Sequence, residues 1–73
     1  MILTPSNIKR LFVDLYGYQW AERASVELGV SEKAIRRWVS GEDRPAARRR
    51  GAIRRLVDAR IEELERWRND LAA

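Results

Sequence analysis

Three basic side chains, Lys33, Arg36 and Arg37, follow a glycine turn within residues 24–41, ASVELGVSEKAIRRWVSG. Arginine and lysine can donate hydrogen bonds to the O6 and N7 atoms of guanine, and glutamate can accept one from cytosine N4. The stretch is typical of a helix, a tight turn centred on Gly29, and a second helix that carries the basic residues. That spacing indicates a helix-turn-helix, whose second helix can enter the major groove of DNA.

Base reading is expected from the outward residues near the start of this second helix. Lys33 and Arg37 are the first candidates, whereas Arg36 either reads a base or holds a phosphate. Glu32 has a second explanation, because an acid in the first turn also complements the helix dipole. The expected base-reading residues are Ser31, Glu32, Lys33, Arg36 and Arg37.

Phosphate binding is expected at helix starts and in the arginine-rich segment after the second helix. Trp20 either packs in the core or touches a sugar-phosphate edge. The run Arg48–Arg50 either binds phosphate or forms a solubilising surface, and its three side chains cannot all point the same way on a helix. The expected phosphate-binding residues are Gln19, Trp20, Ser40, Arg44, Arg48, Arg49 and Arg50.

The positive charge is concentrated in one part of the chain. The 73 residues carry a net charge of +4, and the pI of about 10.3 favours anionic partners. Residues 1–30 are neutral overall, residues 31–55 carry +6, and residues 58–73 carry −2. The positive block therefore lies on the second helix of the motif and just after it. An arginine-rich, solvated helix surface is the alternative explanation.

The composition excludes several kinds of chemistry. There is no cysteine and no histidine, which removes disulfides, thiolate zinc sites and the commonest general base. Glu62, Glu63 and Glu65 are expected on a solvated helix with no pocket to raise a pKa, so no enzyme activity, metal or cofactor is expected. No apolar run approaches the ~20 residues of a membrane span, and the N-terminus is unlike a signal peptide. We expect a cytoplasmic protein.

The first helix that should position the motif begins at Thr4 and Pro5, which suit the N-cap and the first helical position. Gly17 should end it, since glycine readily takes the left-handed conformation there. Apolar residues recur between these ends at the spacing of a helix that packs on a core. They are Ile8, Leu11, Phe12 and Leu15.

The second and third helices are expected at about residues 19–28 and 32–40. Gly29 should end the former, and Ser31 is a suitable N-cap for the latter. The expected inward residues are Trp20 or Ala21, Ala24, Leu28, Ile35 and Trp38.

Helical periodicity resumes from about Pro45 to Leu71, where Gly51 either divides the segment or is tolerated within one helix. Apolar residues seven apart in its second half resemble a short coiled-coil seam. We expect residues 53–71 to form the contact of a homodimer; the alternative is a helix that folds back over the first three. The expected dimer-interface residues are Val57, Ile61, Leu64, Trp67 and Leu71.

No segment alternates like a β-strand. The sequence therefore predicts a single all-α domain over residues 1–73, a small four- or five-helix bundle with a helix-turn-helix and an extended C-terminal helix. A chain of this length buries only roughly 60% of its unfolded surface, so many such bundles gain stability by dimerising.

The run ASVELGVS at 24–31, with Ile35, Trp38, Gly41 and Pro45 after it, resembles the Cro/repressor-like (XRE-type) helix-turn-helix family. Members commonly read LAxxLGVSxxTIxxWExGxxxP. The resemblance implies a small phage or bacterial transcriptional regulator that binds a palindromic operator in double-stranded DNA as a homodimer and represses transcription. Typical members end in a compact fourth and fifth helix, so this chain departs from the family at its C-terminal end.

The sequence therefore predicts one function and leaves one alternative open. The first is a sequence-specific DNA-binding transcriptional regulator. The alternative is a non-catalytic protein-interaction module such as an antitoxin or a phage inhibitor. The outward face of the third helix distinguishes them, because a DNA reader needs it basic and polar, whereas a protein binder favours exposed aromatic residues.

Overall fold

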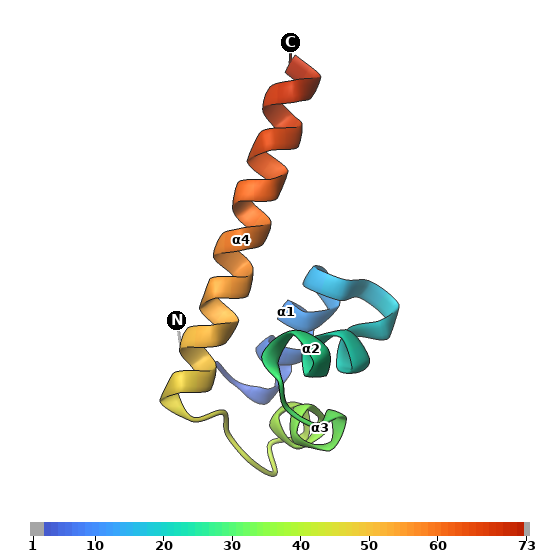
Figure 1. Ribbon diagram of the computed structural model, residues 1–73. Coiled ribbons are helices and arrows are strands. Elements are labelled where there is room, and N and C mark those ends of the chain that lie inside the picture. Colours follow the sequence, from blue (N-terminus) through green and yellow to red (C-terminus); the bar gives the residue numbers. More distant parts are fainter. Residues whose placement is uncertain (1–2, 73) are drawn as a thin grey trace.

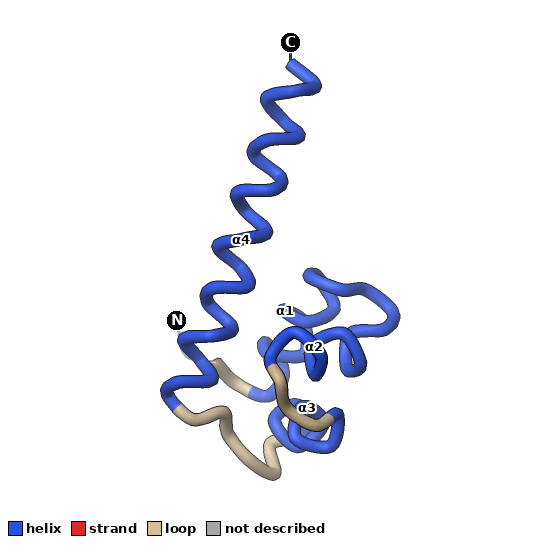
Figure 2. The backbone as a smooth tube through the Cα atoms, in the orientation of Figure 1, coloured by secondary structure: helices blue, strands red, loops and turns tan. Residues whose placement is uncertain are grey.

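The computed structural model describes residues 3–72 (Figure 1). In chain order its elements are α1 (Pro5–Tyr16), the short 3-10 helix η1 (Gly17–Gln19), α2 (Trp20–Leu28), α3 (Glu32–Ser40) and α4 (Ala47–Ala72). Residues 3–72 contain no strand (Figure 2), so the predicted all-α class is confirmed.

The start of α1 is a capping box. The Thr4 hydroxyl accepts a hydrogen bond from the backbone N–H of Asn7 at 3.3 Å, and the N–H of Thr4 donates to the Asn7 side chain at 2.7 Å. Pro5 follows at the first helical position, where no N–H is needed. Gly17 ends the helix with a φ of 69°. Both ends of α1 therefore lie where the sequence predicts them.

A three-residue turn joins α2 to α3. Gly29 adopts the left-handed conformation (φ 65°), and its N–H is directed to the carbonyls of Ser25 and Val26. The Ser31 hydroxyl then accepts the N–H of Ala34 at 3.1 Å and caps α3. At the other boundary α2 begins one residue later than expected, because Gln19 belongs to η1.

The core lies where α1, α2 and α3 pack on one another. Trp20 is only half-buried, whereas Ala21 is buried, so Ala21 is the inward residue of the predicted pair. The alanines of α2 let neighbouring helices approach closely, while Ile35 and Trp38 supply most of the inward surface of α3. The buried core residues are Ile8, Phe12, Ala21, Ala24, Leu28, Ile35, Trp38 and Ile53.

The last helix, α4, is one continuous helix of 26 residues that projects from the other three (Figure 1). Pro45 is buried in the preceding loop, and Gly51 lies within the helix without dividing it. At 1.5 Å per residue α4 is about 39 Å long, and it accounts for the longest of the molecule's dimensions of 47 × 24 × 21 Å.

Only the first turns of α4 join the packed body. Ile53 is its one buried residue among those described, and every residue from 58 to 72 is exposed. The alternative in which this helix folds back over the first three is therefore wrong. The packed body consists of α1, α2 and α3 with the start of α4, rather than a bundle of four or five complete helices.

Candidate nucleic-acid interface

The outer face of α3 carries all the residues predicted to read bases. Ile35 and Trp38 point into the core at a spacing of three, which leaves the helical positions between and before them on the solvent side. The exposed residues on this face, including the N-cap, are Ser31, Glu32, Lys33, Arg36 and Arg37.

The three basic residues of α3 differ in their partners. Arg36 forms an ion pair with Glu32 one turn earlier, with 3.5 Å between Nη2 and Oε1. Arg37 pairs through Nε with Glu42, just beyond α3, at 3.6 Å. Lys33 forms no ion pair with any residue that the structure describes. Because exposed ion pairs contribute only about 0–1 kcal/mol, all three cations can turn to an anionic partner at little cost.

Two cations from other helices, Lys9 of α1 and Arg36 of α3, lie near the ring of Trp20 at the start of α2. The Cζ atom of Arg36 lies 5.6 Å from the centroid of the indole ring, and Nζ of Lys9 lies 5.8 Å from it. A cation over an indole face is attracted by the ring quadrupole. Arg36 therefore has two weak contacts on α3, one with Glu32 and one with Trp20. The Lys9 contact was not anticipated, since no short-range pattern links residues in separate helices.

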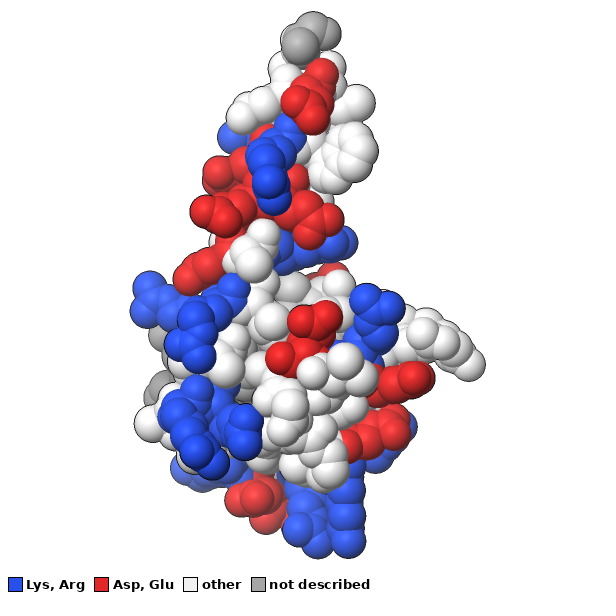
Figure 3. All heavy atoms as spheres, in the orientation of Figure 1, with Lys and Arg blue, Asp and Glu red and all other residues white. Residues whose placement is uncertain are grey.

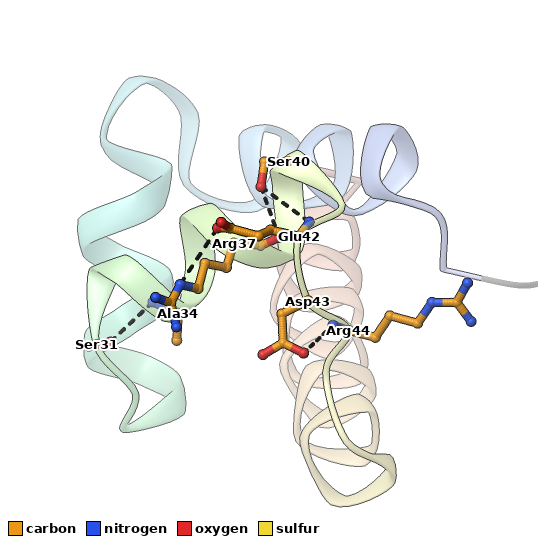
Figure 4. Close-up of polar contacts among 7 residues, drawn as sticks. All are labelled: Ser31, Ala34, Arg37, Ser40, Glu42, Asp43 and Arg44. Atoms are coloured by element: carbon orange, nitrogen blue, oxygen red, sulfur yellow. Dashed lines mark hydrogen bonds and ion pairs between the residues drawn. The ribbon is translucent and has the colours of Figure 1, made fainter.

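The loop after α3 is held by local hydrogen bonds (Figure 4). The Ser40 hydroxyl donates to the Arg37 carbonyl at 3.1 Å and accepts the N–H of Glu42 at 3.3 Å. The carboxylate of Asp43 accepts the N–H of Arg44 at 2.8 Å. The Arg44 side chain extends away from this turn (Figure 4). Of the two predicted phosphate ligands here, Arg44 is thus the available one, whereas the Ser40 hydroxyl is already engaged.

The run of three arginines at the start of α4 is divided by its hydrogen bonds. Arg49 donates from Nη1 to the Leu28 carbonyl at 3.0 Å, and Arg50 donates from Nη1 to the Pro45 carbonyl at 3.0 Å. Arg48 is exposed and forms no side-chain hydrogen bond or ion pair with a described residue. Arg49 and Arg50 therefore hold the start of α4 in place, and Arg48 is the one left for a phosphate.

Gln19, the remaining predicted phosphate ligand, is exposed at the end of η1. Its side chain makes no capping hydrogen bond to α2. Gln19 lies directly before α2, and its exposed side-chain amide can still bind a phosphate.

Basic and acidic side chains are unevenly distributed along the molecule. Figure 3 shows Lys and Arg gathered over the start of α4 and at the end of the molecule where α3 lies, with Asp and Glu prominent on the projecting part of α4. This separation follows the sequence blocks of +6 at 31–55 and −2 at 58–73. An anionic partner is therefore attracted to the end that carries α3.

The predicted dimer-interface residues divide into two groups. Val57 is half-buried and lines a hollow to which Leu3 and Leu11 also contribute. The others leave much of their surface uncovered, with exposed fractions from 49% at Ile61 to 82% at Leu71. Those four exposed residues are Ile61, Leu64, Trp67 and Leu71.

Neither a metal-binding group nor a membrane-spanning helix occurs in residues 3–72. No group of three or more acidic, histidine or cysteine residues in that range is arranged to hold a metal ion. No helix in the same range is both long and apolar enough to cross a membrane.

No protein-family model, no curated protein and no solved structure matches the chain.

Proposed function

We propose that this protein is a sequence-specific DNA-binding transcriptional regulator that acts as a repressor in the cytoplasm. In this proposal two copies bind a palindromic operator, and α2, the Gly29 turn and α3 serve as a helix-turn-helix. The N-terminal half of α3 enters the major groove. Lys33 and Arg37 read bases, and Arg44 and Arg48 hold phosphates.

The observation that carries the proposal is the two-sided character of α3. Its inner side is fixed in the core by Ile35 and Trp38, and its outer side presents exposed polar and basic residues. A reading helix needs this combination, because its side chains must reach base edges from a backbone that does not move. The +6 segment extends the positive surface beyond α3 and supports attraction to phosphates.

The alternative of a protein-interaction module has less support on α3. A protein-binding face is enriched in aromatic residues at its centre, whereas the outer face of α3 carries a serine, a glutamate and three cations. Val13, Tyr18 and Val26 are exposed singly on α1, η1 and α2, whereas four exposed apolar side chains lie together on the far part of α4, which suits a second copy of the chain.

Selection of bound sequences from a random double-stranded DNA library tests the proposal most directly. We expect enrichment of a motif with two-fold symmetry, whose half-sites are about 10 base pairs apart on one face of the duplex. Lack of enrichment over input DNA would overturn sequence-specific binding. Enrichment of an asymmetric half-site would retain DNA reading by α3 and reject the homodimer.

A further inference from the structure

The projecting part of α4 carries an apolar stripe that its own chain leaves uncovered. The stripe consists of Ile61, Leu64, Trp67 and Leu71, whose exposed fractions are 49%, 53%, 59% and 82%. Their exposed parts amount to roughly 500 Å² per chain, so two copies would bury at most roughly 1,000 Å², which is about the lower limit for a specific interface. A second copy of the same helix can therefore cover the stripe, with an interface of the smallest specific size.

We propose that two copies associate through this stripe as a parallel pair of α4 helices. The inference rests on the homodimer of the proposed function and adds its orientation. Arg49 binds the start of α4 to the Leu28 carbonyl, and α3 begins a short turn after Leu28. As a result α3 lies at the end of the molecule opposite the end of α4 (Figure 1).

A parallel pair satisfies the symmetry of a palindromic site. Its two-fold axis runs along the paired α4 helices, so both copies of α3 lie at the same end of the dimer. An antiparallel pair would place the two α3 helices at opposite ends of an elongated dimer. Two recognition helices can then not reach neighbouring half-sites on one straight duplex, which are about 34–36 Å apart.

The charges that flank the stripe also favour the parallel arrangement. With Leu64 and Leu71 in position a and Trp67 in position d, Glu63 and Arg68 take positions g and e, which face each other across a parallel pair, and Ile61 lies at the flank. Glu63 of one copy then lies opposite Arg68 of the other. An antiparallel pair instead places Glu63 near Asp70 or Glu63 of the second copy, where like charges repel.

Arg60 lies within the seam and weakens the pair. Its Nη1 atom is 3.5 Å from Oε1 of Glu63, so the charge is drawn towards the flank while the aliphatic stem stays over the stripe. The uncovered seam spans only about two heptads, fewer than the three or four of a stable coiled coil. The protein alone therefore dimerises weakly and only at high concentration. Binding of two copies to one operator then brings their α4 helices together.

Disulfide trapping tests the orientation, since the chain has no cysteine of its own. We expect Leu71→Cys to form a covalent dimer in a glutathione redox buffer at least tenfold faster than Asn69→Cys. The matched control residue, Asn69, is also exposed near the end of α4 but lies off the stripe. Both substitutions lie beyond the packed body, so the rest of the fold is unaffected. Equal rates for the two variants would overturn the parallel pair.

Sedimentation equilibrium tests the charge pair without cross-linking. We expect Glu63→Arg and Arg68→Glu each to raise the dimer dissociation constant several-fold, and the doubly exchanged chain to return to within about twofold of the original. Residues five apart do not face each other on one helix, so recovery requires contact between copies. Absence of recovery, or an unaltered chain that stays monomeric at its solubility limit, would contradict the proposal. Both measurements omit DNA, so they can fail while selection from the DNA library succeeds.

Discussion

The guanidinium of Arg49 donates from Nη1 to the main-chain carbonyl of Leu28 at 3.0 Å and so joins the first turn of α4 to the last residue of α2. The last carbonyls of a helix lack partners within the helix, and this bond supplies one of them. Gly29 follows at once and begins the turn into α3. The side chain of Arg49 therefore helps to fix the orientation of α4 relative to α2 and to the turn that leads into α3.

Removal of this bond should destabilise the protein. We expect Arg49→Ala to lower the free energy of unfolding by about 1–3 kcal/mol, since a charged donor is lost and a part-buried carbonyl is left without it. Urea denaturation followed by circular dichroism measures the change. Arg48→Ala, one residue earlier and exposed, is the control and should change stability by less than about 0.5 kcal/mol. Equal effects for the two variants would show that the bond contributes nothing.

Truncation of the tryptophans of α3 and α4 should affect the stability of the fold very differently. Trp38 is 6% exposed and Trp67 is 59% exposed. We expect Trp38→Ala to cost about 3–5 kcal/mol, which leaves a domain of this size largely unfolded. Trp67→Ala should leave the thermal midpoint of the dilute monomer unchanged and weaken only self-association. A large loss of monomer stability in Trp67→Ala would show that α4 packs more closely than the structure indicates.

Arg37 should determine sequence preference, with Glu42 restraining it. We expect Arg37→Ala to lower affinity for the selected operator by about 1–3 kcal/mol and to relax the preference at one base position. Glu42→Gln removes the ion pair at 3.6 Å and should raise affinity modestly, most clearly at low salt. Fluorescence anisotropy with operator and scrambled duplexes measures both effects. A uniform loss on all sequences in Arg37→Ala would assign Arg37 to a phosphate.

Arg44 should contribute affinity without specificity. We expect Arg44→Ala to weaken binding to all duplexes alike and to reduce the slope of log K against log salt by about 1. Arg66→Ala, which removes the same charge from the exposed distal half of α4, is the control for net charge. If both variants reduced the slope equally, the effect would come from total charge rather than from a contact made by Arg44.

The hydroxyl of Tyr16 should make stability depend on pH only in the alkaline range. Burial raises the pKa of Tyr16 above its ordinary value of 10.0, Glu27 raises it further, and Arg23 opposes the change. The folded state therefore holds this proton more tightly than the unfolded chain does. Its stabilising effect is fully present below about pH 10 and is lost as pH rises through the raised pKa.

Chemical denaturation on either side of this range measures that dependence. We expect Tyr16→Phe to abolish the component that Tyr16 contributes. Tyr18→Phe is the matched control, since it removes the same hydroxyl from a side chain that is 97% exposed. An alkaline profile that is the same in Tyr16→Phe as in the original chain would contradict the assignment.

Local signals were enough to predict most helix boundaries. Thr4, Gly17, Gly29 and Ser31 each act on the residues next to them, through caps or a positive φ, and each lies where its type predicts. The exposure of the outer face of α3 was equally predictable, because inward Ile35 and Trp38 determine the rest of the helical face. The roles of those exposed residues on DNA stay predictions.

Features that depend on contacts between distant residues were not predictable. Arg49 and Leu28 are 21 residues apart, and nothing near either residue indicates their bond. The residues around Gly51 also do not decide whether it divides α4. Glycine destabilises a helix interior by roughly 1 kcal/mol relative to alanine, and a long helix can tolerate that loss. The projection of α4 away from the packed body also depends on distant contacts. After Leu56 and Val57 no residue of α4 is buried or half-buried, and the point at which contact ends is set by the other three helices.

The uncovered second half of α4 has a consequence for its amide hydrogens. A helix segment of about 15 residues without tertiary contacts is only marginally stable in water. In a dilute monomer the amides beyond Asp58 should therefore exchange with solvent far faster than those of Phe12 or Ile35, whose helices open only with the whole fold. Association would slow this exchange, so folding of the distal helix and recognition of its partner become a single event.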